Sequence, residues 1–93
     1  MKKTYLMIYN DEVGTRDQVK EVLNHHPIET WRYDIPNSFY LVSEESARAI
    51  SEYIRSKLPQ GRFVVTEISN NYWGHTTPDT WHLIKHKAHK PKA

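Results

Sequence analysis

The hydrophobic pattern of the chain alternates between strand-like and helix-like repeats, and this alternation limits the folds open to it. Residues 4–9 form a nearly continuous apolar run that stops at Asn10, which is typical of a strand at the centre of a sheet. A helix is predicted next, because Thr15 and Gln18 fit a capping box and apolar residues follow at helical spacing. Pro27 places the end of this helix near His26.

The middle of the chain changes to a period of two. Residues 28–43 alternate in this way around a turn predicted at 36–38, so they indicate a β-hairpin. Ser43 is the predicted N-cap of a second helix, whose buried stripe comprises Ala47, Ile50, Ile54 and Leu58. Residues 59–61 end this helix, and residues 63–68 form a further strand.

The order strand, helix, strand, strand, helix, strand predicts an α+β fold of the ferredoxin-like, split-βαβ kind. Its sheet has four antiparallel strands and carries both helices on one face. The other face then needs cover from the C-terminal segment or from a second copy of the chain. Thr77, Pro78 and Asp79 predict the start of a short C-terminal helix, and a fifth strand is the alternative. We expect one domain over residues 1–84 and a flexible basic tail over 85–93.

Composition excludes several classes of site. The 93 residues include no cysteine, which excludes disulfides and thiolate metal sites. No apolar run reaches the length of a membrane span, and the run behind the two N-terminal lysines is too short for a signal peptide. We therefore expect a cytoplasmic protein with no membrane partner.

Four lysines near the C-terminus together carry more positive charge than the whole chain, whose net charge is +2. The rest of the chain is therefore mildly acidic. The four lysines are Lys85, Lys87, Lys90 and Lys92, and no acidic residue lies among them. A segment of this kind either contacts the phosphates of RNA or DNA or is simply a solvated tail.

Asp11 follows the predicted central strand and is the candidate catalytic and metal-binding residue. Two symmetry-related Asp11 carboxylates in a homodimer could hold Mg²⁺, which prefers oxygen ligands, and the ion could activate water against a phosphodiester. The alternative is an ordinary strand-to-helix turn, which favours the same residue types.

Three of the six histidines follow one another at helical spacing. His82, His86 and His89 would share one face if the C-terminal helix continued that far, and such a face can bind a transition metal. A polar helix end that frays is the alternative.

Aromatic residues gather on the predicted hairpin and near the C-terminus, where an exposed sheet could stack nucleic-acid bases. Residues 39–42 lack the Lys/Arg-Gly-aromatic motif of RNA-recognition modules and have no flanking Arg or Lys. This favours packing in the core or in a dimer interface. The aromatic set is Trp31, Tyr33, Phe39, Tyr40, Tyr72, Trp73 and Trp81.

Residues 5–10, the hairpin 31–42 and the strand 62–68 together resemble small ferredoxin-like proteins. These are the proteins grouped with the CRISPR-associated adaptation dimer, its SinR-annotated relatives and the VapD toxins. The resemblance implies a homodimer that handles nucleic acid. It also implies a metal site between subunits, to which an Asp at the end of the first strand contributes. That position is Asn10 here, with Asp11 one place later. Either Asp11 substitutes through a local bulge, or the chain lacks the nuclease chemistry.

Three functions follow as hypotheses, and whether the protein is an enzyme stays open among them. The first is a homodimer that binds or scaffolds RNA or DNA. The second is a Mg²⁺-dependent nuclease that uses Asp11 at the dimer axis. The third is a protein-protein interaction module that uses the aromatic C-terminal segment.

Overall fold

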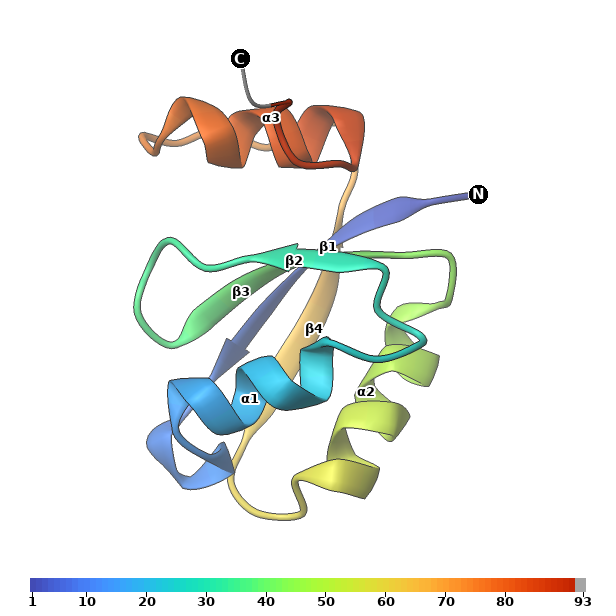
Figure 1. The fold of residues 1–93 in the computed structure, drawn as a ribbon, viewed down its shortest axis with the longest axis vertical. Helices are drawn as coiled ribbons and strands as arrows, with labels where there is room; N and C mark the ends of the chain where they lie inside the picture. Colours follow the sequence, from blue (N-terminus) through green and yellow to red (C-terminus); the bar gives the residue numbers. More distant parts are fainter. Residues whose placement is uncertain (92–93) are drawn as a thin grey trace.

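The computed structural model describes residues 1–91 and contains one four-stranded antiparallel sheet with strand order β2-β3-β1-β4. Three α-helices and one short 3₁₀ helix complete the described chain (Figure 1). In chain order the elements are β1 (Lys3–Tyr9), η1 (Asp11–Val13), α1 (Arg16–Leu23), β2 (Thr30–Arg32), β3 (Ser38–Ser43), α2 (Ala47–Lys57), β4 (Phe63–Ile68) and α3 (Pro78–His86). This confirms the predicted α+β, ferredoxin-like arrangement.

The central strand β1 pairs with β3 on one side and with β4 on the other. Met7 lies opposite Phe39 of β3 and opposite Val65 of β4, and it is fully buried. The apolar run of β1 therefore marks the centre of the sheet, as its composition predicts. One residue departs from the prediction of burial on both faces: Ile8 is 49% exposed.

Helices α1 and α2 cover one face of the sheet and enclose the main core (Figure 1). The predicted capping box of α1 is present, with Thr15 Oγ1 accepting from the Gln18 N–H and the Gln18 side chain accepting from the Thr15 N–H. The helix ends at Leu23, earlier than the predicted end near His26, because the Asn24 N–H already bonds the Glu21 carbonyl. The core on this face consists of Tyr5, Met7, Tyr9, Val13, Val19, Leu23, Ile28, Phe39, Leu41, Ile50 and Ile54.

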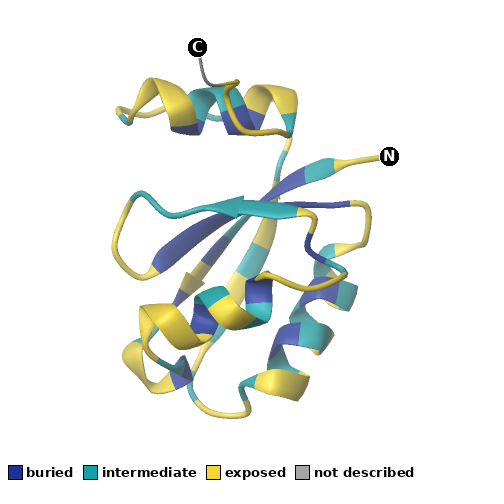
Figure 2. Ribbon diagram, viewed as in Figure 1, coloured by how far each residue is buried: buried dark blue, intermediate teal, exposed yellow. Residues whose placement is uncertain are grey.

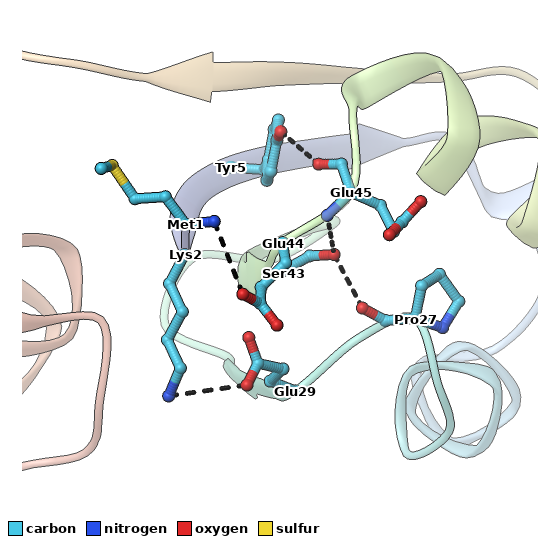
Figure 3. Close-up of polar contacts among 8 residues, drawn as sticks. All are labelled: Met1, Lys2, Tyr5, Pro27, Glu29, Ser43, Glu44 and Glu45. Atoms are coloured by element: carbon cyan, nitrogen blue, oxygen red, sulfur yellow. Dashed lines mark hydrogen bonds and ion pairs between the residues drawn. The ribbon is translucent and has the colours of Figure 1, made fainter.

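Helix α2 begins at a different serine from the one predicted. Ser43 stays in β3, where its hydroxyl donates to the Pro27 carbonyl at 2.7 Å and accepts from the Glu45 N–H at 3.0 Å (Figure 3). Ser46 is the N-cap instead and accepts from the Ala49 N–H. The Ser43 side chain thus fixes the turn after β3, and the capping role passes to the next serine along the chain.

Helix α3 lies on the opposite face of the sheet from α1 and α2 (Figure 1). Its buried side, with Leu83 and Ile84, faces the sheet and packs against Tyr40 and Val42 (Figure 2). The Thr4 hydroxyl donates to the Ile84 carbonyl at 3.1 Å in this buried contact. The C-terminal segment is therefore a helix, the first of the two predicted alternatives, and its last turn includes Lys85 and His86.

Part of the sheet face that carries α3 stays uncovered where β1 meets β4. Ile8 and Val64 lie opposite each other there and are 49% and 56% exposed, and the exposed Thr66 follows on the same face of β4, whereas Leu6 and Ile68 already pack against the α3 cluster. We call Ile8, Val64 and Thr66 the outer strip. Among the described residues, no helix is long and apolar enough to pass through a bilayer.

Candidate functional site

Two cations of α1 lie over two aromatic rings beside the edge strand β2. The Arg16 guanidinium is 4.6 Å from the centre of the Tyr33 ring, and the Lys20 ammonium is 5.6 Å from that of Trp31. Arg16 and Lys20 are four apart in a helix, whereas Trp31 and Tyr33 are two apart in an extended segment. Each pair therefore projects to one side, and the two pairs meet where α1 crosses the edge of the sheet. We call these four residues the cation-aromatic ledge.

The rings of the ledge are held in place by the core beneath them. Trp31 meets Phe39 edge-on with ring centres 5.4 Å apart, and Tyr33 meets the same ring at 5.5 Å. The Trp31 indole N–H donates to the Asn24 side-chain oxygen at 2.8 Å. Because both rings are half-buried, they pack against the core and still border solvent. The predicted packing role of these aromatics is correct, and the structure adds the two cations from α1.

A groove of 610 Å³ runs along β2 next to the ledge. We call it the β2 groove. It receives positive charge from Lys20 and from Arg32. The one acidic side chain among its lining residues is Glu29, which pairs with Lys2 at 3.5 Å (Figure 3). The groove is lined by Lys20, Leu23, Asn24, Ile28, Glu29, Thr30, Trp31, Arg32, Tyr33 and His89.

Arg32 is fixed at the groove by a hydrogen-bond network with the start of α3. Its Nε donates to the Thr80 hydroxyl at 2.7 Å, and its Nη2 donates to the Thr77 hydroxyl at 3.2 Å. The Thr76 and Thr80 hydroxyls both donate to the Asp34 carboxylate. These bonds, that of Thr76 first, lower the pKa of Asp34, since they favour its charged form. The network, which we call the α3 latch, ties α3 to the hairpin.

The structure gives Asn10 a structural role at the end of β1. Its backbone N–H donates to the Arg62 carbonyl, and its side-chain oxygen accepts from the Arg62 N–H, each at 3.0 Å. Asp11 lies one residue later in η1, exposed, and accepts from the Asn37 side-chain amide at 3.0 Å. Asp11 therefore does not occupy the position of Asn10 through a bulge in β1.

A magnesium site at Asp11 does not fit the donors of one chain. The cavity beside Asp11 is also lined by Tyr9, Arg16, Tyr33 and Asn37, which supply one cation and no further carboxylate. Burial first, and the neighbouring Tyr33 second, raise the pKa of Tyr9, which keeps that hydroxyl protonated. Within residues 1–91, no three side chains of the kinds that ligate metals come together. Asp11 as a catalytic or Mg²⁺-binding residue stays a prediction, and we derive no catalytic step from it.

The tail lysines and histidines separate at the end of α3. Lys85 is exposed within the helix, and Lys87 ends it in a left-handed conformation. Lys90 is exposed beyond the helix, and Lys92 lies outside the described residues. His82 and His86 adjoin each other on α3, whereas His89 lies past its end and lines the β2 groove.

Comparison with protein-family models, with curated proteins and with solved structures found no match. The chemistry of the site is therefore the basis for inferring a function.

Sequence reasoning missed Arg16 and Lys20. The signal that could have found them combines two separate patterns in the sequence. Two cations are four residues apart in the first helix, and two aromatic residues are two apart in the strand below it. Once α1 is placed over the strand face that contains Trp31 and Tyr33, the stacked arrangement follows. The α3 latch has no comparable signal in the sequence.

Proposed function

We propose that the protein binds single-stranded RNA or DNA in the β2 groove and acts by binding or scaffolding. The observation that carries the proposal is the cation-aromatic ledge, which combines Arg16 and Lys20 with Tyr33 and Trp31 beside an open groove. The predicted cytoplasmic location is compatible with this role and belongs to the same proposal.

Single strands suit this chemistry better than duplexes do. Proteins that bind single strands combine aromatic surfaces, on which unpaired bases stack, with cations that follow the phosphates. A groove of 610 Å³ is within the size range of cavities that hold small organic ligands, so a nucleotide fits its volume. The exposed rim of Trp31 and Tyr33 offers aromatic surface, and Lys20 and Arg32 offer phosphate contacts from two sides.

The basic tail extends the proposed binding surface. His89 lines the groove, so the chain beyond α3 passes close to it, and Lys87 and Lys90 flank His89 in sequence. Phosphate contacts by Lys85, Lys87, Lys90 and Lys92 would add affinity without reading sequence.

Fluorescence anisotropy with labelled single-stranded oligonucleotides tests the proposal. We expect Lys20→Ala to weaken binding several-fold and to reduce the salt dependence of log K by about 0.7, because one phosphate contact is lost. Lys57→Ala is the matched control, since Lys57 is an exposed lysine of α2 that does not line the β2 groove. No binding by the wild type at low salt, or equal loss in both variants, would contradict the proposal.

A second observation supports homodimerisation as part of the function. The outer strip leaves an isoleucine and a valine half-exposed side by side on a sheet face, and Trp73, in the segment that leads to α3, is 92% exposed. Apolar side chains that adjoin on a small domain favour contact with a second surface. A second copy, related by a twofold axis, would cover both strips at once. We therefore propose that the protein pairs through the outer strip.

A further inference from the structure

Helix α3 presents two histidines one turn apart, with their rings close together. The ring centres of His82 and His86 are 4.4 Å apart, and the ring planes are inclined by 39°. His86 is exposed and His82 is half-buried. The pair lies in the last turns of the helix, which ends where the Lys87 N–H donates to the Leu83 carbonyl at 2.7 Å.

This spacing matches that of two imidazoles bound to one metal ion. With metal-nitrogen bonds of about 2.0–2.1 Å, two imidazoles on adjacent coordination positions have ring centres roughly 4–5 Å apart. The helix supplies this separation because residues four apart lie one above the other on one face.

We propose that His82 and His86 bind one divalent transition-metal ion through their neutral imidazoles. Imidazole is a ligand for Ni²⁺, Cu²⁺ and Zn²⁺, whereas Mg²⁺ prefers oxygen, so the site selects the former class. Within residues 1–91, no third side chain of the usual ligand types joins the pair, so water completes the coordination. Lys85 and Lys87 place positive charge nearby. The affinity is therefore lower than that of a closed structural zinc site.

A bound ion would also stabilise α3. It cross-links two successive turns next to the C-cap, and it binds the helical form of the segment in preference to the unfolded form. Ligand that binds only the folded state raises the melting temperature. Because Leu83 and Ile84 attach this same segment to the sheet, the ion strengthens the cover of that face.

Isothermal titration of the full chain with NiCl₂ and ZnCl₂ at neutral pH, without a histidine tag, tests the proposal. We expect one saturable site in the wild type and its loss in both His82→Asn and His86→Asn. The double variant His25→Asn/His26→Asn is the matched control, because it removes two adjacent histidines in the turn after α1 and should keep the site.

Thermal melting provides a second readout. Ni²⁺ should raise the melting temperature of the wild type and of the control, and should leave that of either single variant unchanged. Absence of saturable binding by the wild type would overturn the proposal. So would binding that survives in both single variants, or binding that is lost in the control.

Discussion

Gly61 and Asn10 together fix the point where β4 begins beside the end of β1. Gly61 has φ +79°, a left-handed conformation that favours glycine. A Cβ atom at this position would lie 2.4 Å from the Val13 amide nitrogen and 2.7 Å from the Asn10 side-chain oxygen. The backbone of η1 therefore packs directly onto Gly61. Next to it, the hydrogen bonds between Asn10 and Arg62 end the pairing of β1 with β4.

We expect Gly61→Ala to lower the free energy of unfolding by about 2–4 kcal/mol, since it combines backbone strain with overpacking. Urea unfolding followed by tryptophan fluorescence measures this change. Gly74→Ala is the control, because a Cβ there has no neighbour closer than 4.0 Å, and it should change stability by less than about 0.5 kcal/mol. Equal stability of the two variants would show that the close approach at Gly61 is not maintained in solution.

Asp34 should make stability depend on pH in the acid range. The pKa of Asp34 is lowered in the folded protein. The contribution of Asp34 to the free energy of unfolding is therefore complete above the ordinary carboxyl pKa, and it is lost as the pH falls through the pKa of the folded protein. Asp34→Asn should cost about 1–3 kcal/mol at neutral pH, because the carboxylate accepts two hydroxyl hydrogen bonds. The free energies of unfolding of the wild type and of Asp34→Asn, measured between pH 7 and pH 2.5, should converge as the pH falls. A constant difference between them would contradict a stabilising role of the charged Asp34 in the α3 latch.

At the scale of elements, α3 converts a two-layer fold into one with both sheet faces partly covered. Leu83 is fully buried against Tyr40 and Val42, and the α3 latch holds the helix start to the hairpin. Apolar packing and hydrogen bonds thus attach α3 at two points along its length.

Leu83→Ala should destabilise the protein by about 2–5 kcal/mol, because it removes a large side chain from a closed contact. Hydrogen-deuterium exchange should then increase first in residues 78–86, while amides of α1 and α2 remain protected. Uniform loss of protection over the whole chain would show that α3 does not open independently of the rest of the fold.

Elements were predictable where a local signal determines them. The capping box predicted the start of α1, the sequence Thr77-Pro78-Asp79 predicted the start of α3, and the apolar run predicted β1. The predicted start of α2 was wrong, because the contact of Ser43 with Pro27 joins residues 16 apart and leaves no local pattern in the sequence.

The candidate site was harder to predict, because its cations and rings come from different elements. Arg16 meets Tyr33 and Lys20 meets Trp31 only through the crossing of α1 over the sheet edge. The latch likewise joins Arg32 to Thr80 across 48 positions. The sequence pointed instead to the tail lysines and to Asp11, whose roles stay predictions.

At the scale of the whole molecule, the two proposed surfaces lie at opposite edges of the sheet. The β2 groove follows one edge strand, and the outer strip includes β4, the other edge strand. A second copy on the outer strip would therefore leave the β2 groove of each copy accessible. A dimer of this kind carries two nucleic-acid sites, which suits a scaffold.

Light scattering at micromolar concentration should give twice the chain mass of 11.1 kDa. Ile8→Glu places a charge in the outer strip and should yield the mass of a single chain, because a buried unpaired charge disfavours association. Gln60→Glu adds the same charge at an exposed position outside the strip and should remain dimeric. A wild type with the mass of one chain would rule out the pairing.

Photo-crosslinking to a single-stranded, thymidine-rich oligonucleotide is the most direct test of binding in the β2 groove. The cross-linked residue is then located by mass spectrometry of the digested protein. Binding in the β2 groove predicts adducts at Trp31 or Tyr33, whose rims border the groove, and their loss in excess unlabelled strand. Adducts confined to the exposed Trp73 or to residues beyond α3, or no adduct at low salt, would contradict it.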